Sequence, residues 1–218
     1  AKAYDFKSIG IIRGEELKDQ PLNPTLQTAQ DLGMALKFIS RTQYRQKHTA
    51  EFVADLQLQY PNAYIIPEGG SNTLAVKGCE EILTDEDAVF NFVCCAVGTG
   101  GTISGIINSL KPHQKALGFP ALKGDFLFND IQKYAKNTQW DLVTDYHFGG
   151  YAKINTELKL FLNSFYQKYL ISLDPVYTSK MVFGVIDLIS KEYFPENSKI
   201  LIIHTGGLQG LQSNIAEI

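Results

Sequence analysis

The 218-residue sequence has no apolar run of membrane-spanning length, and its first residues, AKAYDFKS, lack the apolar segment of a secretory signal peptide. It also lacks a basic surplus, because 20 Lys and Arg against 23 Asp and Glu give a net charge of −3. Nucleic-acid-binding domains usually carry a clear excess of positive charge. We therefore expect a cytoplasmic protein whose partners include neither nucleic acid nor a membrane.

Cysteine is scarce, with Cys79, Cys94 and Cys95 only, and two of the three are adjacent. An odd count with adjacent members is a poor disulfide framework, so we expect reduced, buried thiols. The four histidines are scattered and show no zinc-ligand spacing with a cysteine, so we expect no metal site. The sequence also lacks a G-x-S-x-G elbow, which argues against a Ser-His-Asp hydrolase.

Strand-like and helix-like apolar patterns alternate along the chain, which predicts an α/β fold with parallel sheets. A boundary argued from this alternation divides the chain into a smaller α/β domain, 1–70, and a larger one, 71–218. The expected strands are 8–13, 35–40, 63–67, 89–97, 115–122, 140–146 and 198–204. The expected helices are 25–33, 50–59, 73–83, 103–110, 125–137, 156–169 and 178–192.

The chain is organised around the stretch 89–108, VFNFVCCAVGTGGTISGIIN, which predicts a buried strand, a tight glycine loop and a helix. Three glycines let the backbone approach a ligand closely, and the start of the helix adds N–H groups and partial positive charge. Such a loop suits a phosphate. It has no lysine, so it is not the loop that binds nucleotide triphosphates. On its own, a loop of this kind is more often an ordinary turn.

Further loops follow other expected strands, and ligands of parallel sheets gather at the carboxyl ends of the strands. The loops 68–72 and 204–207 are rich in glycine, and 146–151 is a weaker candidate. Three glycine-rich loops at one sheet edge indicate a pocket, whereas a single one would indicate only a turn.

Four motifs occur in order: PEGGSN at 67–72, GTGGTISG at 98–105, DPVYTSK at 174–180 and HTGG at 204–207. With these motifs the chain resembles the pyridoxal-phosphate enzymes of the tryptophan-synthase-β type, and most of all the 1-aminocyclopropane-1-carboxylate deaminase and D-cysteine desulfhydrase family. GTGGT is shared across these enzymes, while DPVYTSK together with HTGG is much narrower. The resemblance implies two parallel-sheet domains of three layers, pyridoxal 5'-phosphate, a small amino-acid substrate and a homodimer.

The resemblance also implies residue roles. Tyr177 is the expected catalytic phenol, and Glu68 and Asn72 are expected at the edge of the substrate pocket. The expected cofactor-binding residues are Gly98, Thr99, Gly100, Gly101 and Thr102 around the phosphate, Thr178 and Thr205 facing the pyridine nitrogen, and Gly206. Lys180 is expected to be structural.

Without the motifs, the same residues have simpler interpretations. Tyr177 is then an aromatic side chain packed at a helix start, Thr178 a helix cap, and Thr205 a strand-end hydroxyl. Glu68 and Asn72 fit solvated loop positions equally well.

Two departures from the family pattern stand out. Ser179 occupies a position where the family usually has Gly. The Schiff-base lysine and the Ser-Asn-His turn that the family carries in an N-terminal segment have no counterpart in the sequence, so we expect the sequence to be part of a longer chain. These residues alone are then expected to lack turnover.

The expected reaction is conversion of a small amino acid to a 2-keto acid and ammonia. Three hypotheses are open: D-cysteine desulfhydrase-like β-elimination, deamination of the cyclopropane amino acid, and a non-catalytic module that binds a phosphate ligand. The resemblance favours the first, because the D-cysteine enzymes place Thr after the motif tyrosine, where the cyclopropane deaminases place Glu. A carboxylate at the pyridine nitrogen would keep that nitrogen protonated and strengthen the electron sink.

Overall fold

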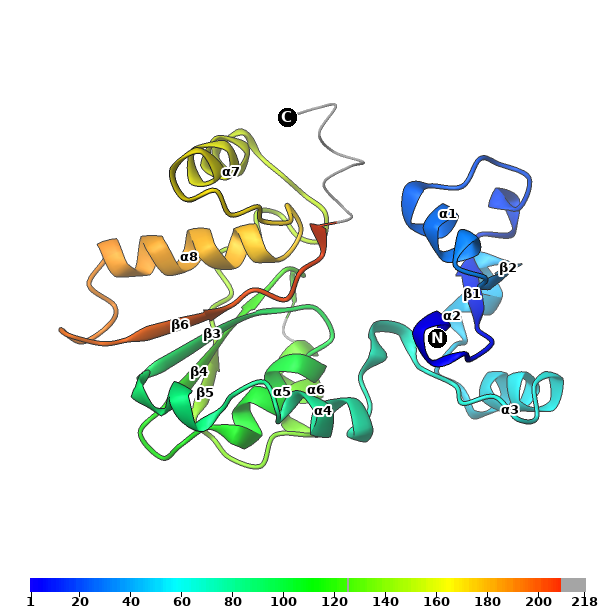
Figure 1. The fold of residues 1–218 in the computed structure, drawn as a ribbon, viewed down its shortest axis with the longest axis horizontal. Coiled ribbons are helices and arrows are strands. Elements are labelled where there is room, and N and C mark those ends of the chain that lie inside the picture. Colours follow the sequence, from blue (N-terminus) through cyan, green and yellow to red (C-terminus); the bar gives the residue numbers. More distant parts are fainter. Residues whose placement is uncertain (125, 209–218) are drawn as a thin grey trace. The chain divides into compact units, whose positions relative to one another are not determined.

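The computed structural model of the chain describes residues 1–124 and 126–208. It divides into two compact units, Ala1–Pro67 and Glu68–Ile218, which are described separately below. Figure 1 shows their elements. Asp125, the first residue of the helix expected over 125–137, lies outside the described residues, as do 209–218.

The first unit is built on two parallel strands, β1 and β2, in which Ile11 lies opposite Lys37. The helix between them begins at Asn23, whose side chain accepts a hydrogen bond from the Leu26 N–H at 2.9 Å, and Pro24 takes the first helical position. Its elements are η1 (Lys2–Tyr4), β1 (Ile9–Arg13), η2 (Glu15–Leu17), α1 (Pro24–Asp31), β2 (Ala35–Ile39), α2 (Arg41–Arg45) and α3 (Ala50–Gln59).

The strand expected over 63–67 is wrong. In the structure this segment is an irregular connection that pairs with no strand of the unit. Tyr64 and Ile66 alternate with less exposed neighbours but are themselves 66% and 68% exposed. The apolar run at 63–67 has no neighbouring strand to supply the hydrogen bonds that a strand needs.

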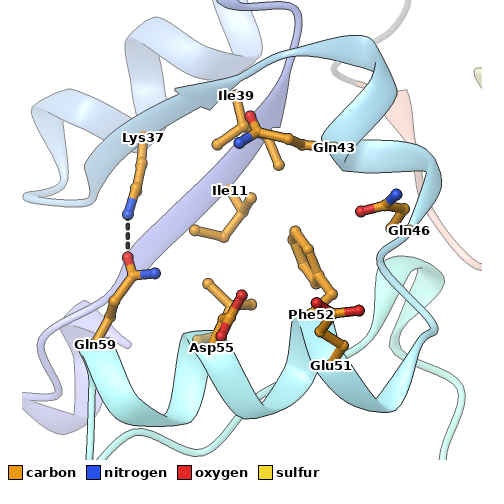
Figure 2. Close-up of a pocket in the computed structure, with 10 residues that line it drawn as sticks. Ile11, Lys37, Ile39, Gln43, Gln46, Glu51, Phe52, Asp55 and Gln59 are labelled. Carbon is orange, nitrogen blue, oxygen red and sulfur yellow. Dashed lines mark hydrogen bonds between the residues drawn. The ribbon is translucent and has the colours of Figure 1, made fainter.

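A hollow of about 180 Å³ lies between α3 and the two strands (Figure 2). Apolar side chains such as Ile11 and Phe52 line it together with polar ones, and Lys37 donates a hydrogen bond to Gln59 across one end. Within residues 1–67, all of which the structure describes, no hydrophobic side chain is buried. None of the expected site residues lines this hollow.

The second unit contains a four-stranded parallel sheet in the order β5-β4-β3-β6. Its central strand, β3, is the apolar run FVCCAV, and four of its six residues are buried. Strands covered on both faces read as continuous apolar runs, which is why this segment shows no alternation. The strands are β3 (Phe92–Val97), β4 (Lys115–Pro120), β5 (Trp140–Leu142) and β6 (Ile200–Ile203).

Helices cover both faces of this sheet, with α4, α5 and α6 on one side and α7 and α8 on the other (Figure 1). One core joins Val93, Cys95 and Val97 to Ile103 and Ile106 of α5; the other joins alternate residues of the same strands to α8. These helices are α4 (Thr73–Cys79), α5 (Gly101–Ser109), α6 (Phe126–Gln132), α7 (Thr156–Tyr169) and α8 (Thr178–Ser190); η3 (Glu68–Gly70) and η4 (Asp85–Val89) are short 3-10 turns.

The α/β class with parallel sheets is thus confirmed, and the second unit has three layers. Among the described residues, no helix combines the length and apolarity needed to span a membrane. The same part of the chain contains no group of three or more His, Cys, Asp or Glu side chains placed to hold a metal ion.

Candidate cofactor site at the carboxyl edge of the second sheet

The glycine loop joins the end of β3 to the start of α5. Gly100 has φ +87° and precedes the helix, so its backbone adopts a conformation that L side chains rarely take. The Ser104 N–H is the first to bond back into the helix, to the Gly100 carbonyl at 3.0 Å. The amides of Gly101, Thr102 and Ile103 come before that bond and therefore have no acceptor within the helix. Three such N–H groups at a helix start form a phosphate-sized anion site.

The loop 68–72 packs directly on the glycine loop. A Cβ added to Gly101 would lie 2.7 Å from the Ser71 Oγ, and one added to Gly69 would lie 2.4 Å from the Thr99 Cγ2. The hydroxyls of Ser71 and Thr99 are 2.6 Å apart and hydrogen-bonded. Glycine suits both positions because a Cβ at either one would collide with a side chain of the facing loop, and Gly69 also has φ +74°.

The two residues expected at the pocket edge belong to this same loop. Glu68 is exposed in η3, while the Asn72 Oδ1 accepts a hydrogen bond from the Ala75 N–H at 2.9 Å. Asn72 is therefore the N-cap of α4, and its side-chain oxygen has a structural partner.

Tyr177 lies over the beginning of the glycine loop. A Cβ added to Gly98 would lie 3.2 Å from the Tyr177 Cε1 and 3.6 Å from its Oη. The ring of Tyr151 packs edge-on against it, with centroids 6.0 Å apart. Burial, followed by the neighbouring Tyr151 phenol and the Asp174 carboxylate, raises the pKa of Tyr177 to about 12. The phenol is therefore protonated at neutral pH and can donate a hydrogen bond or a proton.

Asp174 organises the start of α8. Its carboxylate accepts hydrogen bonds from the N–H groups of Val176, Tyr177 and Thr178 at 2.8 to 2.9 Å, and from the Thr178 hydroxyl at 2.6 Å. A carboxylate at a helix start satisfies the exposed amides and complements the helix dipole. This cap holds Tyr177 at the position from which its ring reaches Gly98.

Thr178 lies buried in the first turn of α8. Its side chain is 0% exposed, its hydroxyl donates to Asp174, and the same oxygen accepts the Asp174 N–H at 2.9 Å. A hydroxyl has a single proton to donate, and here that proton is already used. Thr178 therefore closes the turn that carries Tyr177, with its hydroxyl hydrogen-bonded to Asp174.

The HTGG loop after β6 lies beside this turn. The His204 Nε2–H donates a hydrogen bond to the Ser172 carbonyl at 2.9 Å, and the His204 Nδ1 accepts one from the Gly206 N–H at 3.1 Å. A Cβ added to Gly207 would lie 3.5 Å from the Asp174 Cγ. Thr205, between them, is exposed. The structure thus brings four of the expected loops into one unit. Loop 68–72 packs on loop 98–102, and loop 174–178 packs on loop 204–207.

Three residues of this edge were missed at the level of sequence. Asp174 belongs to a quoted motif, and its spacing before a helix is a capping signal. Ser71 lies inside a loop that was singled out for its glycines. Tyr151 lies in the loop judged weaker, and its contact with Tyr177 has no signal in the sequence.

No model of a protein family matches the sequence. A protein of Pyrococcus horikoshii, whose name assigns it provisionally as a 1-aminocyclopropane-1-carboxylate deaminase, is 31% identical over 230 residues, covering 96% of this chain and 69% of that protein. The chain belongs to the 1-aminocyclopropane-1-carboxylate deaminase and D-cysteine desulfhydrase family. A D-cysteine desulfhydrase of Klebsiella pneumoniae is 31% identical over 184 residues, covering 74% of this chain and 55% of that enzyme.

The crystal structure of an ACC deaminase homologue matches the whole chain with a TM-score of 0.82 at 26% identity, and the match covers 71% of that protein. Membership of the deaminase and desulfhydrase family, whose enzymes depend on pyridoxal phosphate, implies that cofactor for this chain. The residues present fit that cofactor, since Gly98–Thr102 and the start of α5 form an anion cradle and the Tyr177 ring lies beside it.

Proposed function

We propose that the protein converts a β-substituted D-amino acid such as D-cysteine to a 2-keto acid and ammonia, using pyridoxal phosphate held at the carboxyl edge of the second sheet. One observation carries this proposal: the Tyr177 phenol lies against Gly98, the first residue of the anion cradle. A protonated phenol is thereby placed next to the position where a phosphate-anchored ligand begins. Family membership supplies the reaction class.

The proposed cofactor contacts follow the loops. Gly98, Thr99, Gly100, Gly101 and Thr102 are proposed to hold the phosphate through backbone amides and hydroxyls. Thr205 is the proposed partner of the pyridine nitrogen, because its loop lies beside the Tyr177 turn and its side chain is exposed. Glu68 and Gly206 are proposed at the pocket edge. Thr178 is proposed to support the site by holding the turn that carries Tyr177, through its hydrogen bonds with Asp174.

Pyridoxal phosphate, when bound, supplies the electron sink for the charge that develops at the amino-acid Cα. Elimination transfers the Cα proton to a general base and breaks the Cβ–S bond, and the sulfur leaves as hydrogen sulfide after taking up a proton. The Tyr177 Oη carries a proton at neutral pH and is proposed to donate it toward the leaving sulfur. The released enamine becomes an imine, which water hydrolyses to the 2-keto acid and ammonia.

Deamination of the cyclopropane amino acid is the second candidate, since the Pyrococcus relative is named for it. That substrate has no α-proton, and a carbon–carbon bond must break, so a stronger electron sink is required. A carboxylate beside the pyridine nitrogen would provide one. Asp174 is the acid that the structure places at the start of α8, and its two oxygens already accept four hydrogen bonds. Because both Asp174 oxygens are used within this turn, Asp174 is not placed to act as the carboxylate beside the pyridine nitrogen. This favours the D-cysteine reaction.

Neighbouring tyrosines also suit a small substrate. The edge-on pair Tyr151 and Tyr177 places a second aromatic ring beside the phenol that lies against Gly98. We also propose a homodimer and a reducing compartment. The second proposal is supported by the burial of Cys94 and Cys95, which raises the pKa of both thiols to about 12.

The test is cofactor binding followed by turnover, measured on the full-length natural protein. A visible absorbance that borohydride abolishes is expected, as is 2-keto acid release from D-cysteine in excess of release from the cyclopropane amino acid. Absorbance without release from either substrate would support the non-catalytic alternative. Strong release from the cyclopropane substrate with none from D-cysteine would reverse the order of the two candidates.

A further inference from the structure

Lys180 is a lysine inside the second unit. Its side chain is 1% exposed, and its Nζ donates hydrogen bonds to two backbone carbonyls, those of His147 at 2.9 Å and Gly150 at 2.8 Å. Buried lysines are uncommon, and the charged form needs strong partners. Burial lowers the pKa of Lys180 to about 8, and the Asp174 carboxylate opposes that shift. Two of the three ammonium protons are therefore committed to one segment of backbone.

That segment is a turn with an unusual backbone. Phe148, Gly149, Gly150 and Ala152 have φ values of +52°, +92°, +116° and +54°. Left-handed conformations at Phe and Ala cost free energy and persist only where surrounding contacts impose them. The turn has internal hydrogen bonds, including Gly150 N–H to the His147 carbonyl at 3.0 Å, and Lys180 binds both carbonyls that delimit it.

The next residue of the turn is Tyr151, whose ring packs against Tyr177. Tyr177 and Lys180 are three residues apart at the start of α8, so their side chains lie on neighbouring parts of one helix face. The first turn of α8 therefore touches the 147–151 segment at two points. At one point the Lys180 ammonium donates hydrogen bonds to two backbone carbonyls of the segment. At the other, the Tyr151 ring packs against the Tyr177 ring.

We propose that Lys180 is a positioning residue that ties the 147–151 turn to α8 and thereby sets the Tyr151 ring against the phenol of Tyr177. Its importance for catalysis rests on the proposed function, whereas the coupling itself is a property of the chain alone. Lys180 acts through Tyr151, so its removal is expected to change the environment of Tyr177 without removing any group that touches the cofactor.

The alternative is that Lys180 only stabilises the fold. The two readings differ in what happens to Tyr177, because a purely structural lysine would change stability and leave the titration of a correctly folded Tyr177 in place. By the pH at which Tyr177 ionises, Lys180 has already lost its charge, so removing Lys180 has little direct electrostatic effect on Tyr177. The groups that raise the pKa of Tyr177 besides burial are Tyr151 and Asp174.

The experiment places 3-fluorotyrosine at position 177 and follows its ¹⁹F NMR shift with pH. Lys180→Met is expected to lower the titration midpoint by about one pH unit, because the Tyr151 ring moves away and water reaches the phenol. The exposed Lys191 at the end of α8 provides the control, and Lys191→Met is expected to leave the midpoint unchanged. No cofactor is needed, so failure of the proposed function would not affect this readout.

A double-variant comparison decides whether Lys180 acts through Tyr151. Tyr151→Ala, which removes the ring, is expected to lower the midpoint on its own, and Lys180→Met is expected to add less than about 0.3 units in that background. An unchanged midpoint in folded Lys180→Met, or an equal shift in both backgrounds, would overturn the proposal. Should Lys180→Met fail to fold, Lys180→Gln, with a side chain one bond shorter, is measured in its place with the same expected direction and the same overturning result.

Discussion

The Tyr177 ring rests on Gly98, so that a single added carbon at Gly98 would come within 3.2 Å of the Tyr177 Cε1. This contact connects the end of β3 with the start of α8, two segments about eighty residues apart in the sequence. The contact explains why glycine is needed at position 98, the first residue of the anion site. It also sets the distance between the Tyr177 phenol and the glycine loop.

Replacing Gly98 with Ala is expected to displace the Tyr177 ring and to weaken cofactor binding about tenfold. A contact of 3.2 Å is too short to be accepted without movement of the ring or the loop. Gly78→Ala is a matched control, because a Cβ at that helical glycine meets nothing within 4 Å and alanine favours helix. Equilibrium dialysis with pyridoxal phosphate measures both variants, and equal affinity for Gly98→Ala and Gly78→Ala would contradict the assignment.

Replacing Gly101 with Val should weaken cofactor binding more, since even the first added carbon would lie 2.7 Å from the Ser71 Oγ. The smaller variant Gly101→Ala allows a rescue test. Combining it with Ser71→Gly removes the obstructing hydroxyl and is expected to recover at least part of the lost affinity. If Ser71→Gly deepens the loss in the Gly101→Ala background, the two loops are not in the contact described.

These contacts show what the sequence could and could not predict. Glycine pairs after buried strands identify the loops, because few other residues allow such turns at a sheet edge. The partner of Thr178, Asp174, is only four residues away and fits a capping pattern, whereas the contact of Tyr151 with Tyr177 is tertiary and follows a turn with four left-handed residues. Helix α2 was missed although Ser40 and Gln43 form a capping box, since it has only five residues and no apolar period to mark it.

Thr178→Glu is expected to destabilise the protein, by about 3 kcal/mol or more, because a second buried carboxylate would lie beside Asp174. Thr178→Ser keeps the hydroxyl and should cost only about 1 kcal/mol. Urea unfolding measures both free energies, and a Thr178→Glu variant as stable as Thr178→Ser would show that position 178 opens toward the site.

Lys180 makes stability depend on pH in a defined direction. The pKa of Lys180 is about 8 in the folded chain, below its ordinary value of 10.5. Between these values the unfolded chain holds a proton that the folded chain has released, so this lysine's contribution to stability rises with pH. The free energy of unfolding of the wild type, relative to Lys180→Met, is expected to increase by about 1 to 2 kcal/mol from pH 8 to pH 10.

The comparison of wild type with Lys180→Met is necessary because Cys94 and Cys95 make the free energy of unfolding fall as pH rises. Burial raises the pKa of both thiols to about 12, so above pH 9 the unfolded chain loses protons that the folded chain keeps. Both thiols are present in the wild type and in Lys180→Met, and their effect cancels in the comparison. A difference that is flat or falls with pH would show that Lys180 is not the buried, proton-releasing group described.

The central claim, a pyridoxal-phosphate site on Gly98–Thr102 and the start of α5, is tested most directly by ³¹P NMR of the cofactor added to the protein. A phosphate held by the amides of Gly101, Thr102 and Ile103 should remain a dianion, with a shift constant between pH 5.5 and 8. Free pyridoxal phosphate titrates across this range, because its second pKa is about 6. A bound-state signal that is independent of pH is the predicted result, and a signal that follows the free cofactor's titration would contradict the account.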